Sequence, residues 1–122
     1  WEMFPDHPYL LESHFQLTGG LRARGYVSKP IAGLCGYNIS VMDKEQAVLT
    51  ETSGQFDEQR QIFQELRALP LVRSHRAQLS TFSAGGVYAG ACARVDSSLI
   101  ITTHSDLIPL RVVSDRAFGE TP

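Results

Sequence analysis

A lysine followed by a glycine-containing loop is the first feature of this sequence that could do chemistry. Residues 26–38 are YVSKPIAGLCGYN, in which Lys29, one of two lysines in the chain, ends an apolar run. A lysine at a strand end can neutralise a phosphate while loop amides cover it. The stretch is not a P-loop, because that motif places its lysine after the glycines. The local pattern leaves two alternatives open, a phosphate site or a solvated charge at a strand end.

The histidines and cysteines are weaker candidates for chemistry. A zinc site needs three or four clustered ligands, and that spacing is missing from His7, His14, His75 and His104, even if Asp6 or Glu12 is added. We therefore predict no metal ligand. Cys35 could be a nucleophile, but a catalytic thiol needs a lowered pKa and an oriented base, and the sequence indicates neither. Cys35 and Cys92 lack CxxC spacing, which predicts free thiols and a cytoplasmic location.

The composition bounds the class of protein. A chain of 122 residues that is 43% hydrophobic is typical of one globular domain or a piece of one. The net charge is −2, and we predict no nucleic-acid partner, because such a partner usually requires a clustered basic face. The arginines are instead scattered along the chain: Arg22, Arg24, Arg60, Arg67, Arg73, Arg76, Arg94, Arg111 and Arg116. No apolar run approaches the roughly 20 residues of a membrane span, so no membrane partner is predicted. The opening WEMFPDHP lacks the basic start and apolar middle of a signal peptide, so none is predicted. The start at Trp1 and not at Met suggests a cut-out or processed segment.

The elements that must position Lys29 are predicted mainly as strands. Strand-forming residues occupy 25–31, 38–42 and 47–51, around the glycine loop. A proline-initiated helix is expected over residues 8–15, ended by Gly19 and Gly20.

The second half of the chain predicts a hairpin. Residues 77–83 and 87–95 flank the turn signal AGG, and the LIITT stretch at 99–103 indicates another strand. The stretch RQIFQELRALP fits either a helix or a strand. We therefore predict an α+β segment, 1–122, with mainly antiparallel sheet and short helices.

Four stretches, taken in order, resemble a known family. They are WEMFPDHPYLL, GYVSKPIAGLCGYNIS, QELRALP and FSAGGVYAGACARVDSSLIITTHS, and together they span roughly residues 1–108. The chain resembles the C-terminal part of the glutathionylspermidine synthase family of ATP-grasp ligases, to which trypanothione synthetase also belongs. The resemblance implies part of an ATP-grasp fold and a carboxylate–amine ligation through an acyl phosphate. It also implies ATP and Mg²⁺ as cofactors, with a glutathione-like peptide and a polyamine as substrates.

The resemblance also implies roles for single residues. Lys29 matches the family's phosphate lysine, and Gly36 matches a flap glycine whose backbone reaches ATP. Arg94 matches the arginine of a GGxxAGxxxR hairpin, which would stabilise charge developing in phosphoryl transfer; taken alone, it predicts a surface ion pair. The remaining positions fall where the family binds the nucleotide: Gln64, Glu65, Leu66, Arg67, Gln78, Leu99, Ile100 and Ile101.

Departures from the family pattern keep a second hypothesis open. Leu34 and Cys35 stand where relatives usually carry charged flap residues, and Asp106 stands where they tend to have arginine. The family's Mg²⁺-binding carboxylates are expected outside this chain, so the isolated chain is not expected to catalyse ligation. The alternative is an inactive pseudo-ligase that binds a nucleotide or a peptide. An unrelated α+β interaction domain is a third hypothesis.

Overall fold

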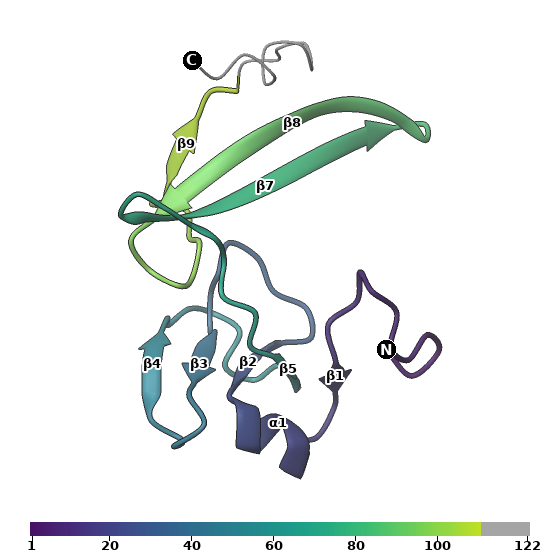
Figure 1. Ribbon diagram of the computed structural model, residues 1–122, viewed down its shortest axis with the longest axis vertical. Helices are drawn as coiled ribbons and strands as arrows, with labels where there is room; N and C mark the ends of the chain where they lie inside the picture. The colour runs from purple at the N-terminus through teal and green to yellow at the C-terminus, as the bar shows by residue number, and fades with distance from the viewer. Residues whose placement is uncertain (111–122) are drawn as a thin grey trace, which may run out of the picture.

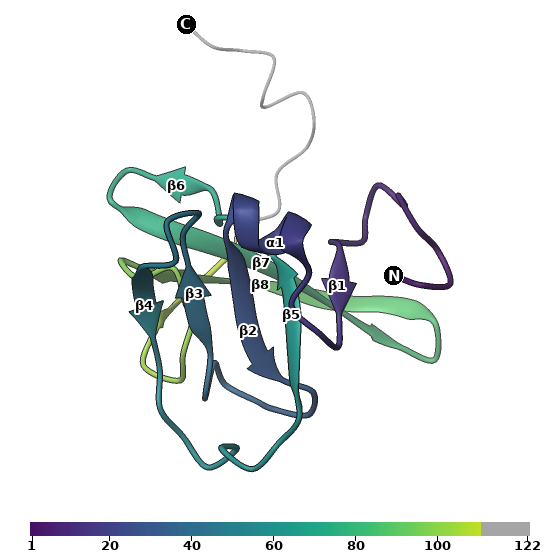
Figure 2. The ribbon, with the colours of Figure 1, turned by 90° about the horizontal axis from the view of Figure 1, so that it is seen from below.

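Two antiparallel sheets and one short helix make up the described part of the chain. The computed structural model describes residues 1–110. Figures 1 and 2 show the long hairpin of the second sheet lying across one face of the first sheet, with its tip extending beyond it. The prediction of a mainly antiparallel fold is confirmed, while the expectation of several short helices is wrong for the described residues. No helix in that part of the chain is long and apolar enough to cross a membrane.

The first sheet has five strands in the order β1-β5-β2-β3-β4. These are β1 (Ser13–His14), β5 (Gln61–Glu65), β2 (Tyr26–Pro30), β3 (Ser40–Met42) and β4 (Val48–Glu51). The three strands predicted around the glycine loop are β2, β3 and β4. The ambiguous stretch forms strand β5, because β5 pairs on both sides, with β1 and with β2.

Strand register assigns Lys29 to one face of this sheet. Lys29 lies opposite Ile62, and Val27 lies opposite Gln64, so these four side chains share a face. We call this face the cavity face. The other face carries Phe63, whose ring meets the ring of Tyr26 edge-on at a centroid distance of 5.9 Å.

The second sheet is dominated by the predicted hairpin. Its strands are β6 (Leu71–Val72), β7 (His75–Ala84), β8 (Val87–Asp96) and β9 (Asp106–Ile108), in that order. The turn between β7 and β8 has φ values of 56° at Gly85 and 80° at Gly86. Glycine adopts that backbone conformation without the steric cost of a side chain, which explains the turn.

The helix forms where the sequence was expected to break it. Helix α1 (Gly19–Arg24) begins after Thr18, whose hydroxyl accepts from the Leu21 amide at 3.2 Å. The two glycines occupy the first turn, where this cap compensates for their low propensity. Leu21 is fully buried, so packing supplies the rest of the stability.

The helix expected over residues 8–15 is absent. Ser13 and His14 instead pair with β5, and Ser13 Oγ donates to the carbonyl of Leu11 at 3.0 Å. Pairing with a neighbouring strand therefore outweighs the local helical signal. Among residues 1–110, the buried apolar core is small and consists of Leu21, Tyr26, Val41, Ala93 and Ile100.

Candidate functional site

A cavity of about 320 Å³ lies between the cavity face and the loop that follows β8. This volume falls at the lower end of the range typical of ligand pockets. Most of the site residues predicted from the sequence line it: Lys29, Gly36, Leu66, Arg67, Gln78, Leu99, Ile100 and Ile101. Val27, Ile39, Val41, Ala68 and Leu69 complete the lining. The structure therefore gathers predicted site residues that are up to 72 residues apart, from Lys29 to Ile101.

A second cavity, of about 440 Å³, lies under the loop between β2 and β3. We call residues 31–37 of this loop the flap. Lys29, Gly36 and Ile39 line both cavities, so the lysine stands at their junction. Lys29 is the only charged residue that lines the flap cavity among residues 1–110. A ligand that occupied both cavities would pass the lysine.

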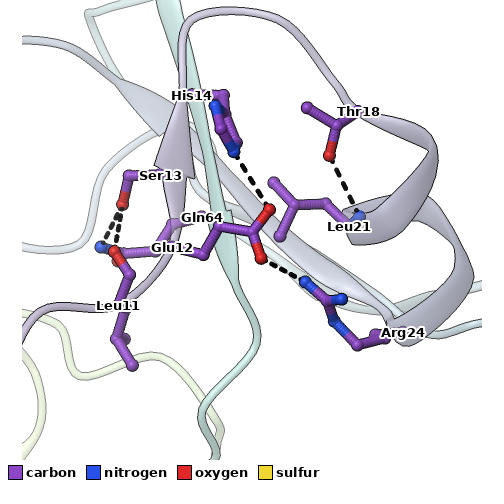
Figure 3. A network of polar contacts seen from close by, with 8 residues as sticks. All are labelled: Leu11, Glu12, Ser13, His14, Thr18, Leu21, Arg24 and Gln64. Atoms are coloured by element: carbon purple, nitrogen blue, oxygen red, sulfur yellow. Dashed lines mark hydrogen bonds and ion pairs between the residues drawn. The ribbon is translucent and has the colours of Figure 1, made fainter. Parts of the chain in front are cut away.

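The Lys29 ammonium is held by a neutral partner. Its Nζ donates to Gln64 Oε1 at 2.8 Å, and Gln64 Nε2 donates to Ser13 Oγ at 2.9 Å. Figure 3 shows the hydrogen bond between Gln64 and Ser13. Within the described residues, no carboxylate forms an ion pair with Lys29. Burial of about half of the side chain lowers the pKa of Lys29 below 10.5, because the charged form is partly desolvated.

Gly36 is needed for a close approach between two loops. Its φ is 74°, and a Cβ atom there would lie 2.4 Å from the carbonyl oxygen of Ile101. Thr52 Oγ1 donates to the Gly36 carbonyl at 2.5 Å and so ties the flap to the end of β4. Sequence reasoning assigned Gly36 to the flap but missed Thr52, because nothing local connects a threonine 16 residues away to that loop.

The loop carrying Leu99, Ile100 and Ile101 is not the strand that the sequence predicted. Backbone amides at 98, 100 and 102 donate to the side chains of Asp96 (2.8 Å), Ser98 (3.1 Å) and Ser105 (2.7 Å), respectively. Ser105 Oγ in turn donates to Asp96 Oδ2 at 2.6 Å. These bonds satisfy amides that a strand ladder would use, so the segment forms a compact loop. We call residues 97–105 the cavity loop.

Asp96 should make the cavity loop sensitive to acid. The hydrogen bonds from Ser105 and Ser98 lower the pKa of Asp96 below 3.8, since they favour the charged carboxylate. The resulting stabilisation is present above the unfolded-state pKa and is lost as pH falls through the lower folded-state pKa. Asp96→Asn should therefore reduce the free energy of unfolding at pH 7, and the difference from the wild type should shrink toward pH 2. Urea titrations at several pH values would measure this.

A matched control for Asp96→Asn is Asp106→Asn, which removes the same charge from an exposed position on β9. Equal losses in both variants would attribute the effect to net charge and contradict the role of Asp96 in the loop.

Arg94 lies beside the cavity but does not line it. It is opposite Gln78 across the hairpin, and its guanidinium donates to the carbonyl of Thr102 in the cavity loop. The structure therefore gives Arg94 a contact that positions the loop. Its predicted role in phosphoryl transfer stays a prediction.

Gln64 and Glu65 also lie outside the cavity lining. Gln64 reaches the site through Lys29, as described above. The Glu65 amide donates to the carbonyl of Glu12 at 2.8 Å, and its position opposite Tyr26 places its side chain on the face away from the cavity. Of the QELR stretch, only Leu66 and Arg67 line the cavity.

The Glu12 side chain joins β1 to α1 and does not mark a metal site. It contacts His14 Nε2 at 3.0 Å and forms an ion pair with Arg24 (Figure 3). In the part of the chain that the structure describes, no three His, Cys, Asp or Glu side chains are grouped to hold a metal ion. Cys35 and Cys92 are both free thiols, as predicted.

The structure defines a small, β-rich unit with two joined cavities and a half-buried lysine between them. The chain belongs to the glutathionylspermidine synthase family, because the family model described as "Glutathionylspermidine synthase preATP-grasp" matches residues 1–113.

Curated relatives are considerably longer than this chain. The bifunctional glutathionylspermidine synthetase/amidase of Escherichia coli (strain K12) is 47% identical over 113 residues, which cover 93% of this chain and 18% of that protein. The protein of the same name from Shigella flexneri gives the same figures. Trypanothione synthetase of Crithidia fasciculata is 35% identical over 108 residues, which cover 88% of this chain and 17% of that protein. The chain thus spans less than a fifth of the length of these relatives.

Proposed function

We propose that this chain forms the nucleotide-binding, C-terminal part of an ATP-dependent carboxylate–amine ligase with an ATP-grasp fold. The observation that carries the proposal is the half-buried Lys29 ammonium at the junction of two cavities, paired only with a neutral amide among the described residues. A partly desolvated charge without a counter-ion favours an anionic ligand.

The two cavities suit different ends of ATP. The cavity beneath the cavity loop is lined mainly by apolar side chains, including Leu66, Leu99 and Ile100, which suit the flat face of a base. The flap cavity carries Lys29 and the backbone of the glycine loop, which suit phosphate oxygens. We therefore assign the base to the first cavity and the phosphates to the second, with Lys29 at the contact between them.

We assign no Mg²⁺ ligand to the described residues, because no suitable cluster of side chains lies there. The ligands of Mg²⁺, and the sites for a glutathione-like peptide and a polyamine, would lie outside this part of the chain. We propose the two substrates from the names of the relatives alone. The overall reaction would join a carboxylate and an amine through an acyl phosphate, in the cytoplasm.

Exposed apolar side chains on the hairpin support a role inside a larger ligase. Leu79, Val87 and Tyr88 are 72%, 69% and 66% exposed, respectively. Apolar side chains of this size on one element are typical of a surface that another part of a protein covers.

Thermal unfolding with and without ATP and Mg²⁺ tests the proposed function. The measurement uses the protein at its native length. A ligand that binds only the folded state raises the midpoint temperature by mass action. A larger increase with ATP than with adenosine at the same concentration is expected, because the contact of Lys29 with phosphate would add to the binding of the base. An unchanged midpoint at millimolar ATP would contradict the proposal.

The affinity for ATP should fall as pH rises toward 10. Burial lowers the pKa of Lys29, so the ammonium is lost at a pH below 10.5, and ATP binding requires the charged form. ATP keeps a constant charge above about pH 8, since the last phosphate pKa is near 6. Lys29→Arg keeps its charge throughout this range, so the affinity of this variant for ATP should stay constant up to pH 10. Calorimetric titrations from pH 7 to 10 would measure it, and identical profiles for the two proteins would exclude Lys29 as the titrating group.

A second candidate function is nucleotide binding without ligation. The observation in its favour is the flap, where Leu34 and Cys35 line the cavity and no other charged side chain among residues 1–110 accompanies Lys29. ADP release in the presence of a thiol peptide and a polyamine would support the ligase. ATP binding with no ADP release would support the second candidate.

A further inference from the structure

We propose that Gln64 is a positioning residue for Lys29, and that Ser13 sets the orientation of the Gln64 amide. This inference rests on the proposed function, because it concerns how the phosphate-binding ammonium is held. Gln64 would act through its side-chain amide, and not as part of the lining of the cavity assigned to the base.

The hydrogen-bond chain has a direction that a backbone carbonyl imposes. Ser13 has one hydroxyl proton, which it donates to the carbonyl of Leu11 at 3.0 Å. Its oxygen can therefore only accept from Gln64, so the amide nitrogen of Gln64 faces Ser13 at 2.9 Å. The amide oxygen is left facing Lys29 Nζ at 2.8 Å.

Three neighbouring strands supply the three residues of this hydrogen-bond series. Ser13 on β1 lies directly opposite Gln64 on β5, and Lys29 on β2 lies two residue pairs further along, opposite Ile62, in the next pair on the same face. All of them are on the cavity face, and all are partly buried. The two-residue strand β1 therefore does more than extend the sheet, since it presents the hydroxyl that orients Gln64.

A neutral partner orients the lysine without neutralising it. A lysine side chain loses considerable rotamer freedom when it is fixed, so holding it in place before binding reduces the cost of binding. A carboxylate at position 64 would also hold the ammonium, but it would neutralise the charge and repel phosphate. An amide satisfies one of the three ammonium protons and leaves the positive charge available to an anion.

Two substitutions at position 64 separate positioning from packing. Gln64→Leu removes the acceptor, and it should lower the pKa of Lys29 further and weaken ATP binding by about tenfold. Gln64→Glu keeps the shape, and it should raise the pKa of Lys29 yet weaken ATP binding at least as much. The pKa would be measured by NMR on labelled lysine, and the affinity for ATP by calorimetry, both in the protein at its native length.

The matched control is Gln61→Leu. Gln61 lies on the same strand but on the opposite face, where it contacts Ser28 Oγ at 3.4 Å. Its replacement should leave both the pKa of Lys29 and the affinity for ATP unchanged.

Substitutions of Ser13 test the orientation of the amide. Ser13→Ala removes the hydroxyl that fixes Gln64, and it should weaken ATP binding by a few-fold. Ser13→Thr keeps a hydroxyl and should restore most of the affinity. Equal losses in the two variants would point to packing and overturn the orienting role.

The outcomes distinguish this inference from the proposed function. If Gln64→Leu and Gln64→Glu both leave the pKa of Lys29 unchanged, the positioning role is overturned, whatever ATP does. If the pKa moves in the two expected directions but neither these variants nor Lys29→Ala changes the affinity for ATP, the proposed function fails and the lysine–glutamine contact stands.

Discussion

Lys29→Ala should weaken ATP binding by about 10- to 100-fold, because a hydrogen bond from a charged group contributes about 1.5–3 kcal/mol. The ammonium lies at the junction of the two cavities, so its loss removes the only positive charge that lines the flap cavity among the described residues. Lys29→Met, which keeps the length of the apolar stem, should lose as much affinity. Calorimetric titration with ATP and Mg²⁺ would measure the change.

Lys44→Ala is the matched control for this loss. Lys44 is the other lysine of the chain, and its side chain is 70% exposed beside Glu45, away from both cavities. Its substitution removes the same formal charge and should leave ATP binding unchanged. A similar fall in both variants would mean that net charge, and not the position of Lys29, determines the affinity.

Gly36→Ala should destabilise the protein by about 2–3 kcal/mol and disrupt the cavity. An added Cβ would lie 2.4 Å from the Ile101 carbonyl oxygen, and the φ of 74° is unfavourable for alanine. The flap and the cavity loop would have to separate, which would also disturb the Thr52 bond to Gly36. Urea unfolding would measure the stability, and ATP titration would report the loss of the site.

Gly33→Ala tests whether the effect belongs to that contact. Gly33 is in the same flap, but a Cβ there would meet the Pro30 Cβ at 3.5 Å, an ordinary contact. The control variant should remain close to the wild type in stability. A Gly36→Ala protein as stable as Gly33→Ala would contradict the close packing of the two loops.

Local sequence signals predicted the strands better than they predicted the helix. The hairpin was predictable because the residues of its turn, Gly85 and Gly86, carry their conformational preference locally. Helix α1 was not, because its stability depends on the burial of Leu21 and on the Thr18 cap, which outweigh two glycines. The LIITT stretch was predicted as a strand because its β propensity is high, whereas the hydroxyls of Ser98 and Ser105 accept hydrogen bonds from its amides at Ile100 and Thr102.

The candidate site was predictable only where single residues carried a signal. Lys29 and Gly36 stood out from their local pattern, and the family resemblance added Gln78 and Ile100 to the same site. The partners that hold these residues were missed, since contacts such as Ser13 with Gln64 depend on strand pairing across 51 residues. Register within a sheet is a property of the whole fold and leaves no local mark on the sequence.

A crystal structure of the native-length protein with a non-hydrolysable ATP analogue and Mg²⁺ would test the central claim most directly. We predict the base between Leu66 and the cavity loop, and a phosphate oxygen within hydrogen-bond distance of Lys29 Nζ, with Gln64 still bonded to the ammonium. A nucleotide bound elsewhere, or phosphates that leave Lys29 without contact, would contradict the proposed site.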